Sequence, residues 1–143
     1  MTNGRRKTRG IALQVLYEFD YTQHDPKSIL TRLSETQPLS QEANLFVREL
    51  VLGVISNQSK IDSIIQEFAP AWPLAQISAI DKNILRLAIF ESLLDNKVPT
   101  KIAINEAVEL AKKFGSDNSA RFVNGVLGAV HNQYNKCECE TGS

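Results

Sequence analysis

The chain has 143 residues, and its 16 basic and 16 acidic side chains cancel to a formal net charge of zero. A chain of this size is most simply one domain that is stable without disulfides, and its neutral balance excludes a surface that coats a polyanion uniformly. Because no apolar run approaches the roughly 20 residues that a membrane span needs, we expect a soluble, cytoplasmic protein.

The positive charge is concentrated at the beginning of the chain. Residues 1–10 contain no acid and four bases, which are Arg5, Arg6, Lys7 and Arg9. Residues 11–70 carry four basic against eight acidic side chains. A basic end on a neutral protein indicates a local contact with a polyanion. On composition alone, a solvated and frayed terminus explains these residues equally well.

The first half of the chain shows apolar residues at helical spacing. A first helix is predicted from Thr8 to about Tyr21, with Tyr17 on a face that adjoins the core stripe. Asp25 followed by Pro26 has the pattern of an N-cap and the first residue of a short second helix. After a break at 38–40, the apolar stripes at 43–54 and 61–68 predict two more helices.

The second half continues this pattern after a connection. The sequence PAWP at 70–73 cannot continue a helix, because proline lacks an amide donor and restricts the residue before it. A long, heavily buried helix is predicted from about Ile77 to about Asp95, and another begins near Pro99. Because alternating β patterns are almost absent, the sequence predicts an all-α fold of about seven helices.

Residues 101–127 predict a helix, a stop at Gly115, a polar turn and a last helix. A glycine at the stop can take the left-handed conformation that satisfies the final carbonyls. The dipeptide Asn124–Gly125 is also a hairpin signal, but the apolar spacing around it favours a helix. Gly125 and Gly128 would then share a face that another backbone or a ligand can approach closely.

The end of the chain is polar. We interpret residues 1–135 as one helical domain and 136–143 as a disordered tail. Cys137 and Cys139 lie in this tail, where a bridge across one residue would be strained, so we expect reduced thiols.

The sequence lacks the patterns of an enzyme. It has no phosphate-binding glycine loop, no nucleophile elbow and no cluster with metal-ligand spacing. His24 and His131 are isolated, and Glu109 precedes Lys113 by four residues, the spacing of a solvated ion pair. We therefore predict a binding protein without catalytic residues, cofactor or metal.

Aromatic residues accompany two groups of basic residues. Tyr17 follows the basic amino terminus on the first helix and offers a surface on which an unpaired base can stack. The basic and aromatic residues on either side of the turn at 115–118 form the second group, which comprises Lys101, Lys112, Lys113, Phe114, Arg121 and Phe122. The two phenylalanines lie on apolar stripes, so a core role is the favoured alternative for them.

Three stretches of this sequence closely resemble the NusB family of bacterial transcription antitermination factors. They are RRKTRGIALQVLYEFDYTQ at the amino terminus, IDKNILRLAIFESL in the centre, and IAINEAVELAKKFG followed after five intervening residues by RFVNGVL. The resemblance covers most of the chain, in order. A related module is fused to some RNA cytosine methyltransferases.

The resemblance implies two small packed helical subdomains and no enzymatic activity. It implies binding of the single-stranded boxA element of nascent RNA together with the ribosomal protein NusE, in a larger complex with other Nus factors and RNA polymerase on ribosomal RNA operons. The residues that match the family's RNA-binding positions are Arg5, Arg6, Lys7, Arg9, Tyr17, Phe114, Gly115, Ser119, Arg121, Phe122, Asn124 and Gly125. Lys101 and Lys113 are added from the basic group around the turn.

The resemblance also places a NusE surface near Glu18, Glu67 and Asp81. These acids would complement a basic ribosomal protein, although each is equally compatible with a solvated helix charge. Two other functions stay open. One is the RNA-binding module of a methyltransferase, for which 143 residues leave no room for the catalytic domain, and the other is a helical adaptor that binds only protein.

Overall fold

The computed structural model describes residues 3–142, with side chains described for residues 5–134. The described part of the chain contains seven α-helices and no strand, which confirms the predicted all-α class. It divides into two compact units, Met1–Gln58 and Ser59–Ser143. None of the described helices combines the length and the apolar composition that crossing a bilayer requires.

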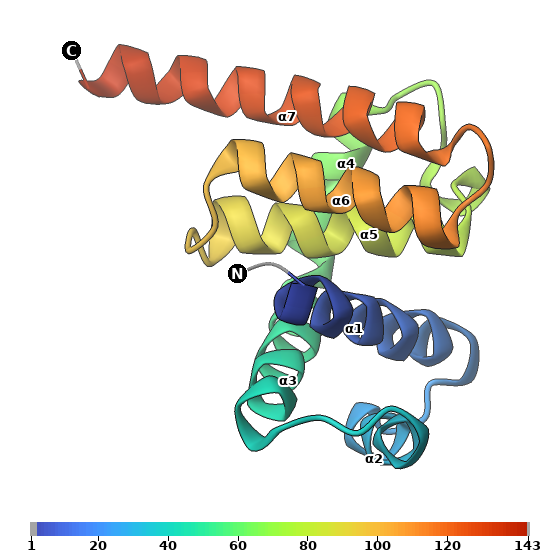
Figure 1. Cartoon of the computed structure of the whole chain (residues 1–143). Coiled ribbons are helices and arrows are strands. Elements are labelled where there is room, and N and C mark those ends of the chain that lie inside the picture. The colour runs from blue at the N-terminus through green and yellow to red at the C-terminus, as the bar shows by residue number, and fades with distance from the viewer. Residues whose placement is uncertain (1–2, 143) are drawn as a thin grey trace. The chain divides into compact units, whose positions relative to one another are not determined.

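The first unit contains three helices, α1 (Asn3–Thr22), α2 (Pro26–Thr36) and α3 (Gln41–Ser56), and α1 packs against both others (Figure 1). Local capping explains two of the helix starts. The Asp25 carboxylate accepts a hydrogen bond from the Lys27 amide at 3.4 Å, and the Ser40 hydroxyl accepts one from the Ala43 amide at 3.0 Å. The apolar stripes meet in a core that includes Ile11, Ala12, Val15, Leu16, Ile29, Leu30, Val47, Leu50, Val51 and Val54.

Helix α1 begins at Asn3, five residues before the predicted start at Thr8. The basic amino-terminal residues are therefore part of a helix. Their side chains are distributed around the helix axis at the 3.6-residue period, so residues four apart share a face and neighbours do not.

The second unit contains α4 (Gln58–Phe68), the short 3₁₀-helix η1 (Leu74–Gln76), α5 (Ala79–Ile89), the π-helical turn η2 (Phe90–Leu94), α6 (Thr100–Phe114) and α7 (Ser119–Gly142). Figure 1 shows α5, α6 and α7 side by side, and each of these helices contacts the other two. The Asn124–Gly125 pair lies within α7, so the helix prediction is confirmed over the hairpin.

The polar tail at 136–143 was predicted to be disordered. The side chains of this tail, including those of Cys137 and Cys139, lie outside the described set. The backbone of residues 136–142 continues α7, which the expectation of a disordered tail did not include, and the reduced thiols stay a prediction.

A buried ion pair connects α4 to α5. The Arg86 guanidinium binds the Asp62 carboxylate through two hydrogen bonds, Nε to Oδ1 at 2.8 Å and Nη2 to Oδ2 at 2.9 Å. A third donor of the same group reaches Asn83 Oδ1 at 3.1 Å. Only 4% of the Arg86 side chain is exposed. The pairing therefore occurs in a weakly solvated environment, where removing the carboxylate would leave the guanidinium charge buried without its partner.

Candidate nucleic-acid interface

The four basic residues at the start of α1 point in two directions. The Arg5 guanidinium lies 3.8 Å from the centroid of the Phe46 ring on α3, and that of Arg9 lies 5.7 Å from it. Both distances are within the range of cation–π attraction, and Arg9 is buried. Arg6 and Lys7 occupy other positions around the helix and are exposed. The basic run thus serves the packing of α1 on α3 with one face and offers charge to the solvent with another.

Tyr17 projects from α1 one helical turn before Tyr21. The two rings form an edge-to-face pair with centroids 5.0 Å apart, and Tyr17 is 36% and Tyr21 70% exposed. The neighbouring Tyr21 side chain raises the pKa of the Tyr17 phenol, which is already neutral at physiological pH in its ordinary range. A neutral, exposed aromatic pair can accept a stacked base without repelling its phosphate.

A groove between α6 and the start of α7 brings together three of the predicted site residues, Lys101, Arg121 and Asn124. The groove has a volume of about 520 Å³. Its floor is apolar and its rim is polar, and the lining residues are Lys101, Ile104, Asn105, Val108, Ala120, Arg121 and Asn124. An apolar floor suits the face of a base, amide groups can pair with a base edge, and cations on the rim can bind phosphates.

The turn before the groove depends on Gly115 and Ser119. Gly115 does not adopt the predicted left-handed conformation, because its backbone is extended, with φ −95° and ψ −170°. The glycine is instead required for space, since a Cβ at this position would lie 2.8 Å from the Ala111 carbonyl oxygen. The buried Ser119 hydroxyl accepts a hydrogen bond from the Ser116 amide at 2.9 Å and closes the turn. In the structure, these two predicted site residues shape the turn.

The cations and aromatic rings next to the turn form their own contacts. The Lys113 ammonium lies 5.3 Å from the centroid of the half-buried Phe114 ring. Glu109 pairs with Lys112 at 3.7 Å, so the expected pair with Lys113 is replaced by one three residues apart. Phe122 is also half-buried, and its ring contacts Trp72.

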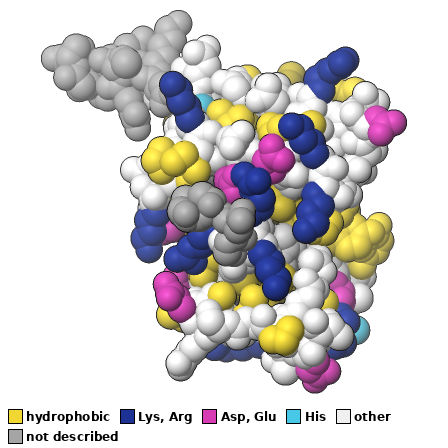
Figure 2. Space-filling model, viewed as in Figure 1, with side chains coloured by type: hydrophobic (Ala, Val, Ile, Leu, Met, Phe, Trp, Pro, Cys, Tyr) yellow, Lys and Arg dark blue, Asp and Glu magenta, His cyan; other side chains and the backbone are white. Residues whose placement is uncertain are grey.

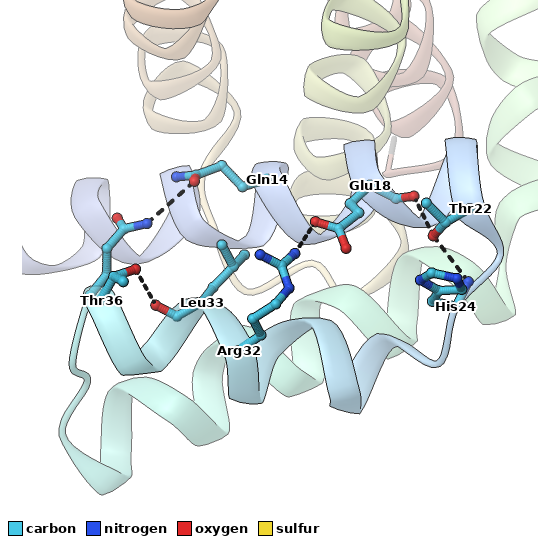
Figure 3. A network of polar contacts seen from close by, with 8 residues as sticks. Gln14, Glu18, Thr22, His24, Arg32, Leu33 and Thr36 are labelled. Atoms are coloured by element: carbon cyan, nitrogen blue, oxygen red, sulfur yellow. Dashed lines mark hydrogen bonds and ion pairs between the residues drawn. The ribbon is translucent and has the colours of Figure 1, made fainter.

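The three predicted partner-binding acids lie on three different helices. Figure 3 shows Arg32 of α2 reaching the Glu18 carboxylate on α1, so this carboxylate is already paired. Glu67 is exposed on α4. Asp81 lies in the first turn of α5, where the helix dipole stabilises its charge, and its Oδ1 atom is buried without a hydrogen-bond partner among the described residues.

The charges on the surface are mixed. On the face drawn in Figure 2, Lys and Arg side chains stand singly among hydrophobic and acidic ones. This distribution agrees with the formal net charge of zero. Affinity for a polyanion must therefore come from a few well-placed contacts, because the total charge provides no general attraction.

Sequence reasoning missed the contacts of His131 on α7. This residue is 2% exposed, and its Nε2 atom lies 3.0 Å from the Ser92 hydroxyl of η2. That hydroxyl donates to the Ala88 carbonyl at 2.7 Å, so it accepts a hydrogen bond from Nε2. Burial lowers the pKa of His131, which keeps the ring neutral. No local signal connects two residues 39 positions apart.

The described residues contain no group of three or more His, Cys, Asp or Glu side chains that could hold a metal ion. The candidate site therefore consists of basic, amide and aromatic side chains. These groups bind by charge, hydrogen bonding and stacking.

Residues 6–132 match the sequence model of the NusB family. The chain is 52% identical to the transcription antitermination protein NusB of Roseiflexus sp. (strain RS-1) over 136 residues, which cover 94% of this chain and 96% of that protein.

Two solved structures have a similar fold. The first is T. maritima NusB, with a TM-score of 0.81 and 33% identity, covering 91% of this chain and 92% of that one. The second is a chain from the crystal structure of antitermination factors NusB and NusE in complex with dsRNA, with a TM-score of 0.82 and 28% identity, covering 94% of this chain and all (100%) of that one. The match to the family model and the identity to its members show that this chain belongs to the NusB family.

Proposed function

We propose that this protein is a transcription antitermination factor that binds boxA-type single-stranded RNA together with the ribosomal protein NusE. The observation that carries the proposal is the α6–α7 groove, where Lys101, Arg121 and Asn124 surround an apolar floor. The chain that carries this groove belongs to the NusB family. One solved structure of similar fold contains NusB and NusE in complex with dsRNA.

The cations and the aromatic rings have separate tasks in this proposal. Arg6, Lys7, Lys101 and Arg121 are exposed and supply contacts with phosphates, which give affinity but carry no sequence information. Tyr17 and Tyr21 offer stacking surfaces, and Asn124 can pair with a base edge. Stacking requires unpaired bases, so the RNA bound here is single-stranded, whereas the solved complex of NusB and NusE holds dsRNA.

NusE provides the second surface that makes binding tight. We assign Glu67 and Asp81 to this contact, because acidic residues complement a basic ribosomal protein. Glu18 is already paired with Arg32, so it would have to share its carboxylate between Arg32 and NusE. The protein would act in the cytoplasm with other Nus factors and RNA polymerase, without enzymatic activity of its own. Transcription past a terminator placed downstream of a boxA-type element measures this activity.

The binding experiment uses fluorescence anisotropy of three labelled RNAs, a boxA-type single strand, a scrambled single strand and a duplex. Each is titrated with the protein at two salt concentrations, with and without purified NusE. We expect preference for the boxA-type strand and tighter binding when NusE is present. Equal affinity for all three RNAs in both conditions would overturn the proposed selectivity for boxA-type RNA, and no binding to any of them would favour an adaptor that binds only protein.

A further inference from the structure

The connection between α4 and η1 exposes a large aromatic side chain. Trp72 is 53% exposed, although tryptophan is highly buried in most proteins. Its ring contacts the Phe122 ring in an edge-to-face arrangement, with centroids 6.3 Å apart and an interplanar angle of 78°. The indole is therefore supported by α7 and still open to solvent over about half of its surface.

The backbone that carries Trp72 is held in place. The Trp72 amide donates to the Ala69 carbonyl at 3.0 Å. The Gln66 side chain of α4 binds the loop on both sides of the intervening proline, donating to the Trp72 carbonyl at 3.0 Å and accepting from the Leu74 amide at 2.8 Å. The flanking prolines further limit the backbone. A ring held in this way loses little conformational freedom when a ligand binds.

The surroundings of Trp72 favour a nucleic acid as the ligand. Phe122, which supports the indole, follows Arg121, and Arg121 lines the groove with Lys101. Residues 68–80 carry no charged side chain, and the acids that border this segment, Glu67 and Asp81, are those assigned to the NusE contact. Cations next to an exposed, fixed aromatic ring are the combination that proteins use to bind single-stranded nucleic acids.

We propose that Trp72 is a stacking platform for one unpaired base of an RNA strand that binds along the α6–α7 groove, with Phe122 fixing the orientation of the indole. This inference rests on the proposed RNA-binding function and adds a specific contact to it. Stacking is tolerant of base identity, so Trp72 contributes affinity and position along the strand, whereas the amides of the groove contribute base selectivity.

Trp72 is the only tryptophan of the chain, so fluorescence excited at the long-wavelength edge of protein absorption, where tyrosine does not absorb, reports on this residue alone. A boxA-type single-stranded RNA with a terminal label is titrated with the protein, and label anisotropy is recorded. In a matched titration, unlabelled RNA is added to the protein, and tryptophan emission is recorded with N-acetyltryptophanamide as the inner-filter control. Stacking of a base on the indole quenches its emission. We expect quenching that saturates together with the anisotropy.

Two substitutions separate stacking from packing. Trp72→Phe keeps an aromatic face and should retain most of the affinity, whereas Trp72→Leu keeps apolar bulk without a π-face and should weaken binding by about 5- to 100-fold. Tyr134→Leu is the control variant. It removes a different exposed aromatic ring, which lies on α7, and should leave the affinity for RNA unchanged. Circular dichroism verifies that each variant is folded. If a variant does not fold, the tryptophan emission of the unaltered protein still tests the proposal.

The outcomes are distinguishable. Anisotropy that reports binding without any change in tryptophan emission, together with wild-type affinity of Trp72→Leu, would overturn the stacking role and leave the proposed function intact. No anisotropy change with any RNA, with or without NusE, would overturn both. If NusE alone changes the emission and Trp72→Leu weakens only NusE binding, Trp72 contacts protein and the stacking role is wrong.

Discussion

Gly115 lies so close to Ser119 that a Cβ atom added to the glycine would be 2.4 Å from the Ser119 hydroxyl oxygen and 2.5 Å from the Ser119 Cβ. The serine cannot move away freely, because its hydroxyl accepts the hydrogen bond from the Ser116 amide at 2.9 Å. This contact sets the geometry of the turn between α6 and α7. The same turn also positions Arg121 and Asn124 on the rim of the groove.

Replacement of Gly115 by alanine should therefore destabilise the protein. We expect Gly115→Ala to lower the free energy of unfolding by about 1–3 kcal/mol through overpacking, and to weaken RNA binding at the groove. Urea unfolding and RNA anisotropy measure the two effects. Combining Gly115→Ala with Ser119→Gly removes the contacting side chain and should recover part of the loss.

Gly128→Ala is the matched control for Gly115→Ala. No described atom beyond its own helix lies within 4 Å of a Cβ added at this exposed position of α7. Since alanine favours a helix over glycine by about 0.8–1.0 kcal/mol, Gly128→Ala should stabilise the protein. Equal stability of the two variants would contradict the close contact at Gly115.

The ion pair between Asp62 and Arg86 makes a second prediction. Asp62→Ala leaves a largely buried guanidinium without its two carboxylate bonds, so the free energy of unfolding should fall by about 3–5 kcal/mol. Glu109→Ala removes the exposed pair with Lys112 and should cost at most about 1 kcal/mol. Chemical denaturation measures both variants. Similar losses for the two would show that burial does not strengthen the Asp62 pair.

His131 predicts a dependence of stability on pH. Burial lowers its pKa in the folded protein, whereas in the unfolded chain the pKa is about 6.5. Below pH 6.5 the unfolded state binds a proton that the folded state excludes, so stability decreases as the pH falls. The loss due to His131 stops growing once the pH is below its pKa in the folded protein.

The variant His131→Gln isolates this contribution. Free energies of unfolding measured between pH 8 and pH 5 should show a shallower decrease for His131→Gln than for the unaltered protein. The difference between the two curves, and not either curve alone, reports on His131, because carboxylates also titrate near the lower limit. Parallel curves would mean that His131 takes up its proton equally well in both states.

Local signals in the sequence were sufficient to predict most of the helices. Asp25 caps α2 as expected, and Ser40 caps α3 at the end of the predicted break at 38–40, because a capping side chain binds an amide two or three residues away. The start of α1 was missed because residues 3–7 contain no apolar side chain that would mark a core-facing stripe. The division of the basic run follows only once the helix begins at Asn3.

Contacts between distant residues could not be predicted in the same way. Asp62 and Arg86 are 24 positions apart, and Ser92 and His131 are 39 apart, so only the packing of the helices brings them together. The reason for Gly115 was also hidden, because steric space depends on the shape of the turn, which composition does not reveal. The candidate site was easier, since Lys101 and Arg121 belong to one recognisable basic group around a single turn.

The groove cations provide the last prediction. Phosphate contacts release counterions, and the slope of log K against log salt concentration is about −0.7 per contact for a single strand. If Lys101 and Arg121 each bind one phosphate, the variant with both changed to alanine should bind RNA more weakly and reduce the magnitude of this slope by about 1.4. Anisotropy titrations at several salt concentrations measure the slope.

Lys60 and Lys97 are exposed lysines outside the groove lining, so a double alanine variant of these two is the charge-matched control. It removes the same net charge and should leave the slope almost unchanged, because a few local contacts, and not the total charge, determine counterion release. If both double variants reduce the slope equally, the RNA follows the general charge of the protein, and the α6–α7 groove is not its binding site. A reduction confined to Lys101 and Arg121 places the phosphate path along the groove.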